Sequence, residues 1–223
     1  LGGIFMYLYL NNLNLKKEAS LLGAISFIFS GVFIAWGWWG NIIHTLIWLP
    51  LLLLCVDKII YFLCHPGLDP GSIKLSYRFQ IKSGMTSRIF FWSILFIFSL
   101  CSSFFAGHLQ TFFYVFLTSF AYLVLRIYQL KNTLMIQFIK VKKLYLLFAF
   151  CFLLFALIAS IQWKPTLDFI NQSTRSLDQA DWQKSGWFLP WQNLAQFVAP
   201  DFFGNPATLN YWGIWNYAEF VGY

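Results

Sequence analysis

The sequence has few charged residues. Asp, Glu, Lys and Arg make up only 10% of its 223 residues, against about 25% in soluble domains. Hydrophobic residues make up 59%, and the mean hydropathy is +0.64. Several apolar runs approach or exceed the ~18 residues that cross a bilayer as a helix. The composition excludes an ordinary soluble domain and predicts an all-α, polytopic membrane protein.

Strong catalytic motifs are also absent. The sequence contains no P-loop, no GxSxG, no HExxH and no CxxC pair. Its four cysteines lie in or beside apolar runs, without metal-type spacing: Cys55, Cys64, Cys101 and Cys151. We expect them to be small buried hydrophobic side chains, and no cofactor site is visible.

The two ends of the sequence lack the usual start and stop signals. Leu1 is not Met and lies within an apolar run, and no helix stop or tail precedes Tyr223. No signal peptide is visible. We therefore expect an internal piece of a longer protein.

The apolar runs predict five complete membrane spans and part of a sixth, at about residues 1–10, 19–38, 42–63, 89–105, 108–128 and 144–161. Pro50 removes one backbone hydrogen bond from the run 42–63, so we expect a kink there. Asp57 and Lys58 lie near the far end of that run, where we expect them to reach the interface. On this interpretation the spans carry no central charge.

The connections differ in kind. Only Ala106 and Gly107 separate two spans, which predicts a tight antiparallel pair in which glycine lets the helices approach closely. Residues 129–143 combine apolar side chains with four lysines, a pattern typical of a helix in the interface. We expect a transmembrane region, 1–161, followed by an aromatic-rich segment, 162–223.

The basic residues are distributed unevenly between the two sides. Of the 15, twelve fall in or beside the connections on one side, and only Lys164, Arg175 and Lys184 fall on the other, with five of the eight acidic residues. Because basic loops stay in the cytoplasm, residues 162–223 are predicted to be extracytoplasmic. The positive net charge is thus a topology signal and does not indicate nucleic-acid binding.

The segment 162–223 mixes aromatic residues with Pro, Gly, Asn and a few charges. Asn210, Tyr211 and Glu219 are candidates for sugar contact, because aromatic rings stack on sugars and amides or carboxylates bind hydroxyls. Glu219 or Asp201 would suit a general base. The alternative is an ordinary belt of Trp and Tyr at the bilayer surface.

Three further candidates lie near the same side of the membrane. His108 and Gln110 follow the tight turn, where a lipid-linked head group would lie, although polar side chains there also satisfy the free backbone groups of a helix N-terminus. His44 is at similar depth, with an interfacial role as its alternative. Arg175 suits a phosphate because its donors match phosphate oxygens; otherwise it is an ordinary exposed arginine.

Several segments, taken in order, resemble one family. SGVFIAWGWWGNIIHTLIWLPLLLL, AGHLQTFFYVF, WKPTLDFINQSTRS and LAQFVAPDFFGNP, followed by NYWG and NYAEFVGY, are similar to the bacterial YfhO-like membrane proteins, which are grouped with the GT-C type glycosyltransferases. The similarity covers most of the chain apart from residues 65–88, where this sequence looks extended.

The resemblance implies an enzyme of the bacterial cytoplasmic membrane. It would transfer a sugar from a polyprenyl-phosphate carrier to a cell-envelope glycan or lipid on the outer face. The family's catalytic acid, sometimes aided by a divalent metal, would lie upstream of Leu1. The matching positions are expected to place substrate and support the scaffold: Gly107, His108, Gln110, Arg175, Pro200, Gly204 and Tyr223.

Two other functions stay open. A transporter or flippase would perform no chemistry of its own, and transporters place charged residues near the bilayer midplane. The expected absence of a central charge argues against that class. A non-catalytic scaffold for envelope assembly is the other alternative.

Overall fold

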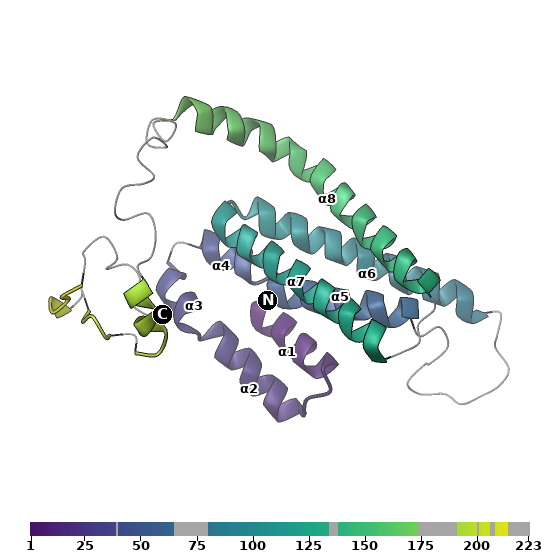
Figure 1. The fold of residues 1–223 in the computed structure, drawn as a ribbon, viewed down its shortest axis with the longest axis horizontal. Coiled ribbons are helices and arrows are strands. Elements are labelled where there is room, and N and C mark those ends of the chain that lie inside the picture. The colour runs from purple at the N-terminus through teal and green to yellow at the C-terminus, as the bar shows by residue number, and fades with distance from the viewer. Residues whose placement is uncertain are drawn as a thin grey trace. The chain divides into compact units, whose positions relative to one another are not determined.

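A computed structural model describes residues 1–38, 40–64, 80–133, 138–173, 191–199, 201–205 and 208–213. Within these ranges the chain is helical and contains no strand, which confirms the predicted all-α class (Figure 1). The elements are α1 (Gly2–Asn12), α2 (Lys17–Ile28), α3 (Gly31–Trp36), α4 (Asn41–Leu46), α5 (Leu49–Cys64), α6 (Gln80–Phe105), α7 (Leu109–Thr133), α8 (Phe138–Gln172) and the 3-10 turn η2 (Trp191–Phe197).

Four helical segments in the described part of the chain are long and apolar enough to cross a membrane: Asn41–Cys64, Thr86–Phe105, Leu109–Leu130 and Val141–Gln172. They coincide with four of the predicted spans, and the protein is a polytopic membrane protein. By contrast, α1 and α2 have 11 and 12 residues, well below the ~20 needed to cross a bilayer.

The stretch predicted as one span over 19–38 is not a single helix. α2 ends at Ile28, and α3 begins at Gly31 after Ser30, whose backbone is extended at φ −64° and ψ 153°. Serine and glycine are weak helix formers, and such pairs commonly mark breaks. The break also falls where the chain passes between two compact units: Leu1–Ile28 with Trp39–Ile161 (unit 1), and Phe29–Trp38 with Gln162–Tyr223 (unit 2).

The predicted distortion at Pro50 takes the form of an interruption. α4 ends at Leu46, and α5 begins at Leu49 with Pro50 in its first turn. Proline has no N–H to donate back to Leu46, and it disfavours helical backbone at the residue before it. The span Asn41–Cys64 therefore consists of two consecutive helices, α4 and α5.

The region 129–143 does not form a separate helix where it is described. Residues up to Thr133 continue α7, and residues from Phe138 onward begin α8. Leu134 and Met135, which helped to suggest an interfacial helix, lie outside the described residues. In the sequence, only residues 134–137 separate the end of α7 from the start of α8.

The core of unit 1 forms around α5, which packs against α1, α6 and α7. α4 also packs against α6 and α7, and α1 pairs with α2 as a short hairpin (Figure 1). Ten of the sixteen residues of α5 are buried. The interior of unit 1 around α5 is therefore mostly apolar, and a polar side chain buried there needs a hydrogen-bonding partner.

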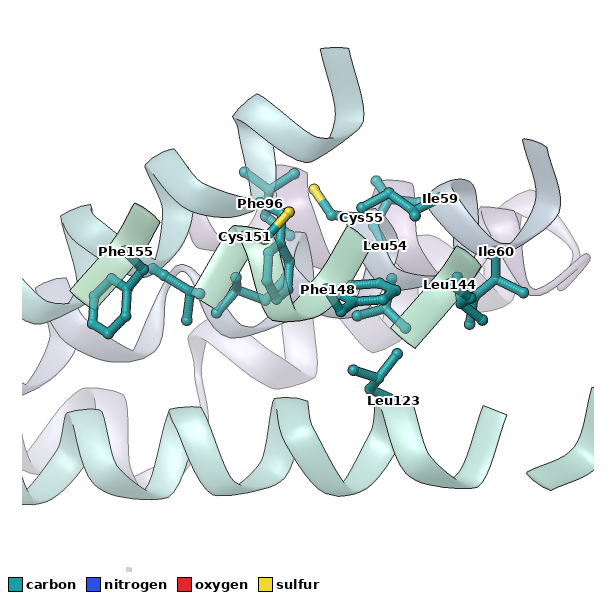
Figure 2. Close-up of a cluster of buried hydrophobic side chains, with 14 of the residues drawn as sticks. Leu54, Cys55, Ile59, Ile60, Phe96, Leu123, Leu144, Phe148, Cys151 and Phe155 are labelled. Carbon is teal, nitrogen blue, oxygen red and sulfur yellow. The ribbon is translucent and has the colours of Figure 1, made fainter. Parts of the chain in front are cut away.

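Phenylalanine rings join α8 to its neighbours. Phe148 and Phe152 meet the Phe96 ring of α6 at centroid distances of 5.5 and 5.8 Å. Phe155 meets Phe104 of α6 and Phe112 of α7 at 5.8 and 5.6 Å. Three of these four pairs are edge-to-face, a favourable geometry at such distances, and the Phe155–Phe112 pair is tilted. Figure 2 shows part of the buried core, with Phe96, Phe148 and Phe155 among the labelled side chains, together with the buried Cys55 and Cys151.

The cysteines behave as predicted. Cys55, Cys64 and Cys151 are buried, Cys101 is half-buried, and none of these four is in a disulfide. A polar contact also links two spans, because the Ser103 hydroxyl of α6 donates to the Thr45 carbonyl oxygen of α4 at 2.9 Å. Small hydroxyl side chains commonly join helices in membranes in this way.

The two ends of unit 1 differ in charge. Lys58, Arg88, Arg126, Lys142 and Lys143 lie toward one end of their helices, which we call the basic end. The turn between α6 and α7 lies at the other end, which we call the turn end. α8 leaves unit 1 at the turn end, because Phe155 contacts the last turn of α6 and the first turn of α7. The helix continues past Ile161 to Gln172, with Pro165 inside it.

Candidate functional site

A polar cluster lies inside the apolar interior of unit 1, centred on the carboxylate of Asp57. Arg126 Nε donates to its Oδ1 at 2.6 Å, and Asn12 Nδ2 donates to its Oδ2 at 3.1 Å. The Tyr122 hydroxyl donates between the two oxygens, 3.1 Å from each. The Tyr9 ring packs edge-on against Tyr122, with centroids 6.1 Å apart. Three helices, α1, α5 and α7, therefore meet at one carboxylate.

This cluster corrects the prediction that the Asp57 side chain reaches the interface. The Asp57 side chain is only 3% exposed, within the span Asn41–Cys64, and its partner Arg126 lies within the span Leu109–Leu130. An unpaired charge in such surroundings would be very costly, and a hydrogen-bonded opposite charge offsets that cost. The pairing explains how an ionised carboxylate can occupy this position.

The cluster's chemistry is that of a satisfied ion pair. Both carboxylate oxygens have donors, and the guanidinium carbon lies 5.7 Å from the centroid of the Tyr122 ring. The arginine side chain is 36% exposed while the aspartate is closed off. A ligand that approached the cluster would therefore contact Arg126 and not Asp57.

The sequence contained a signal for this pair that our reading missed. α5 and α7 both run toward the basic end, and a few residues before that end α5 carries the acidic Asp57 and α7 carries the basic Arg126. Two opposite charges at equal depth on neighbouring spans are expected to pair, since neither can be solvated by lipid. We had instead counted Arg126 with the basic connections.

At the turn end, the structure supports the structural interpretation of His108. Gly107 has φ +87° and ends α6, and its N–H donates to the Phe104 carbonyl oxygen. His108 Nδ1 then accepts the Thr111 N–H at 3.2 Å and lies 2.7 Å from the Thr111 hydroxyl. This is the contact of an N-cap, which satisfies one free N–H of α7.

Gly107 is required for a reason other than the predicted close approach. No other atom lies within 4 Å of the position that a Cβ would occupy there. The positive φ, which glycine adopts without strain, is the constraint. Gly107 and His108 together end one helix and start the next.

The other two candidates at this end are exposed. Gln110 Nε2 donates to the Tyr114 hydroxyl at 3.2 Å, one turn along α7. His44 lies on α4, and its backbone N–H donates to the Gly40 carbonyl oxygen. Neither contact closes off the side chain, so both residues are accessible from the turn end.

In unit 2, Asn210 organises its own loop. Its Oδ1 accepts the Asn205 N–H and the Thr208 hydroxyl, both at 2.8 Å. Gly204, with φ +79°, packs so closely that a Cβ would collide with the Asn210 carbonyl oxygen. The Asn210 oxygen proposed for sugar hydroxyls is therefore already used inside the loop.

Tyr211 is buried and Trp212 is 64% exposed. Burial raises the pKa of the Tyr211 hydroxyl above its usual value. The Trp212 ring packs on Phe203 with centroids 4.8 Å apart and keeps an open face. Trp212 thus suits ring stacking better than Tyr211, which had been the candidate.

Arg175 and Glu219 lie outside the described residues, as do Pro200 and Tyr223. The described candidates are divided, with His44, His108 and Gln110 in unit 1 and Asn210 and Tyr211 in unit 2. In the described part of the chain no group of His, Cys, Asp and Glu could hold a metal ion. The divalent metal that the family resemblance leaves open stays a prediction.

Comparisons of the chain with family models, with curated proteins and with solved structures returned no match.

We predict that Asp57 and Arg126 are energetically coupled. Asp57→Asn and Arg126→Gln should each lower the free energy of unfolding, because each leaves a polar partner unmatched in the membrane. The double variant should cost less than the sum, with a coupling energy of about 1–3 kcal/mol. Thermal unfolding of the four proteins in one detergent measures this. Additive losses would show that the pair does not act as a unit.

We also predict that His108 acts as a helix cap. His108→Ala should destabilise the protein by about 1 kcal/mol, whereas His108→Asn should not, since asparagine is a good N-cap. Gln110→Ala is the matched control and should leave the melting temperature unchanged. If Asn and Ala are equally destabilising, the cap is not the stabilising contact.

Proposed function

We propose that the protein is part of a membrane glycosyltransferase of the GT-C type, in the bacterial cytoplasmic membrane. It would take a sugar from a polyprenyl-phosphate carrier and pass it to an envelope glycan or lipid on the outer face. The ordered resemblance to the YfhO-like proteins suggests this activity. One structural observation supports it further: His44, His108 and Gln110 all lie at the turn end of unit 1, where His44 and Gln110 are exposed.

The charge distribution supports this orientation. Lysine and arginine concentrate at the basic end and in its connections, and such connections stay in the cytoplasm. The turn end would then face the outside, where lipid-linked sugars are used. Exposed aromatic side chains in unit 2, including Trp191 and Trp212, would offer rings on which sugars stack.

In this proposal an acceptor hydroxyl loses its proton to a base and its oxygen bonds to the anomeric carbon of the donor sugar. The bond from that carbon to the carrier phosphate oxygen breaks, and the phosphate leaves with the electron pair. Gln110 and His44, both exposed at the turn end, would contact the sugar or the phosphate. Arg175 would suit the departing phosphate charge. No residue of this chain is assigned as the base.

A second candidate function is a transporter or flippase, and the Asp57–Arg126 pair specifically favours it. Charged residues within spans mark the pathways of many transporters. The pair lies within two spans, toward their basic ends. On this alternative the same carrier-linked sugar would cross the membrane without being transferred.

The activity is tested with the full-length protein in vesicles that contain a labelled polyprenyl-phosphate sugar. We expect the label to appear in an envelope acceptor, and Gln110→Ala to reduce its rate of transfer while the protein stays folded. Label that changes leaflet but stays on its carrier would favour the flippase. Label that neither moves nor transfers, over a range of acceptors, would remove both proposals and favour a scaffold.

The orientation has its own test in whole cells. A cysteine placed at Gln183 should react with an impermeant thiol reagent before lysis, and a cysteine placed at Lys16 should react only after it. The parent protein is the control for the four native cysteines. The reverse pattern would place residues 162–223 in the cytoplasm and overturn the outer-face activity.

A further inference from the structure

The guanidinium of Arg126 is held rigidly from one side. Nε is bonded to Asp57 Oδ1, Nη1 donates to Gln129 Oε1 at 3.3 Å, and the group lies over the Tyr122 ring. Asp57 in turn is oriented by Asn12 and Tyr122. An arginine fixed in this way has lost most of its conformational freedom before any ligand arrives.

Part of the guanidinium remains available. The group has five N–H donors, and its contacts with the described residues use Nε and one N–H of Nη1. Nη2 has no acceptor among the described residues. Because the side chain is 36% exposed, these donors reach the surface of the protein while the inner edge stays buried.

The surface around Arg126 faces lipid. On the same helix, Leu125 is 57% exposed and Tyr128 is 62% exposed. Large exposed apolar side chains on a membrane span indicate contact with acyl chains. At the basic end they indicate the level where chains meet head groups, where arginine reaches outward and tyrosine is enriched. The free donors of Arg126 therefore open toward head groups.

The electrostatics at this end suit an anion. Asp57 neutralises one positive charge, but Lys142 and Lys143 are exposed on the first turns of α8, just after the connection from α7. The start of α8 thus adds exposed positive charge to the basic end, where Arg126 also lies. Surfaces of this kind attract anionic lipids.

We propose that Arg126 is the centre of a binding site for the phosphate group of an anionic phospholipid, in the leaflet at the basic end. The fork of guanidinium donors binds two phosphate oxygens, and Lys142 and Lys143 add longer-range attraction. Leu125 and Tyr128 contact the acyl chains. Asp57 is a positioning residue, because it holds the arginine without touching the lipid. This site is independent of sugar transfer at the turn end.

The site is tested by native mass spectrometry of the full chain, titrated with phosphatidylglycerol or with phosphatidylcholine. Arg126→Lys keeps the charge and the attraction to Asp57 but loses the planar fork. Lys143→Gln keeps the fork and removes one nearby charge. We expect Arg126→Lys to weaken phosphatidylglycerol binding about fivefold or more, and Lys143→Gln to weaken it by less than about twofold.

The outcomes separate the interpretations. Equal losses in the two variants, or no preference of the parent protein for phosphatidylglycerol, would overturn the site and leave only diffuse charge. Displacement by millimolar inorganic phosphate would keep the phosphate site but overturn a lipid as its occupant. Circular dichroism checks the fold of each variant. If Arg126→Lys does not fold, the double variant Asp57→Asn/Arg126→Gln replaces it and should lose the preference.

Discussion

The carboxylate of Asp57 imposes the strongest single constraint on unit 1. Within a bilayer no water is present to solvate a charge, so the helices around an ionised group must supply every donor that it needs. α1 supplies Asn12, and α7 supplies Tyr122 and Arg126. Apolar packing alone would tolerate a helix sliding or rotating by a few ångströms. The hydrogen bonds to the carboxylate would be broken by such a shift. The carboxylate therefore sets the register of α1 and α7 against α5.

The aromatic contacts act differently from this pair. The rings of Phe96, Phe104 and Phe112 receive α8 through broad surfaces with no strict donor or acceptor geometry. Dispersion between such rings favours close packing in lipid, where hydrophobic transfer contributes little. Unit 1 thus combines one specific polar junction near the basic end with a more permissive aromatic interface along α8.

Much of this architecture could be predicted from the sequence. Four spans follow from runs of apolar residues, because a bilayer demands about twenty of them in a row. The break at Ser30, which limits α2 to 12 residues, could not be predicted in that way, since hydropathy measures lipid compatibility and not helix continuity. The role of Gly107 was identified only in part, because a positive φ depends on where two helices end. Asn210 looked like a sugar ligand because nothing in its sequence shows that its oxygen closes a loop.

α8 does not end where its apolar run ends. The eleven residues from Gln162 to Gln172 continue the helix, and at 1.5 Å per residue they add up to about 16 Å beyond Ile161. The head-group layer on each face of a bilayer is only about 5–7 Å deep. The last turns of α8 therefore extend beyond the head-group layer, so the polar side chains on them can be solvated by water.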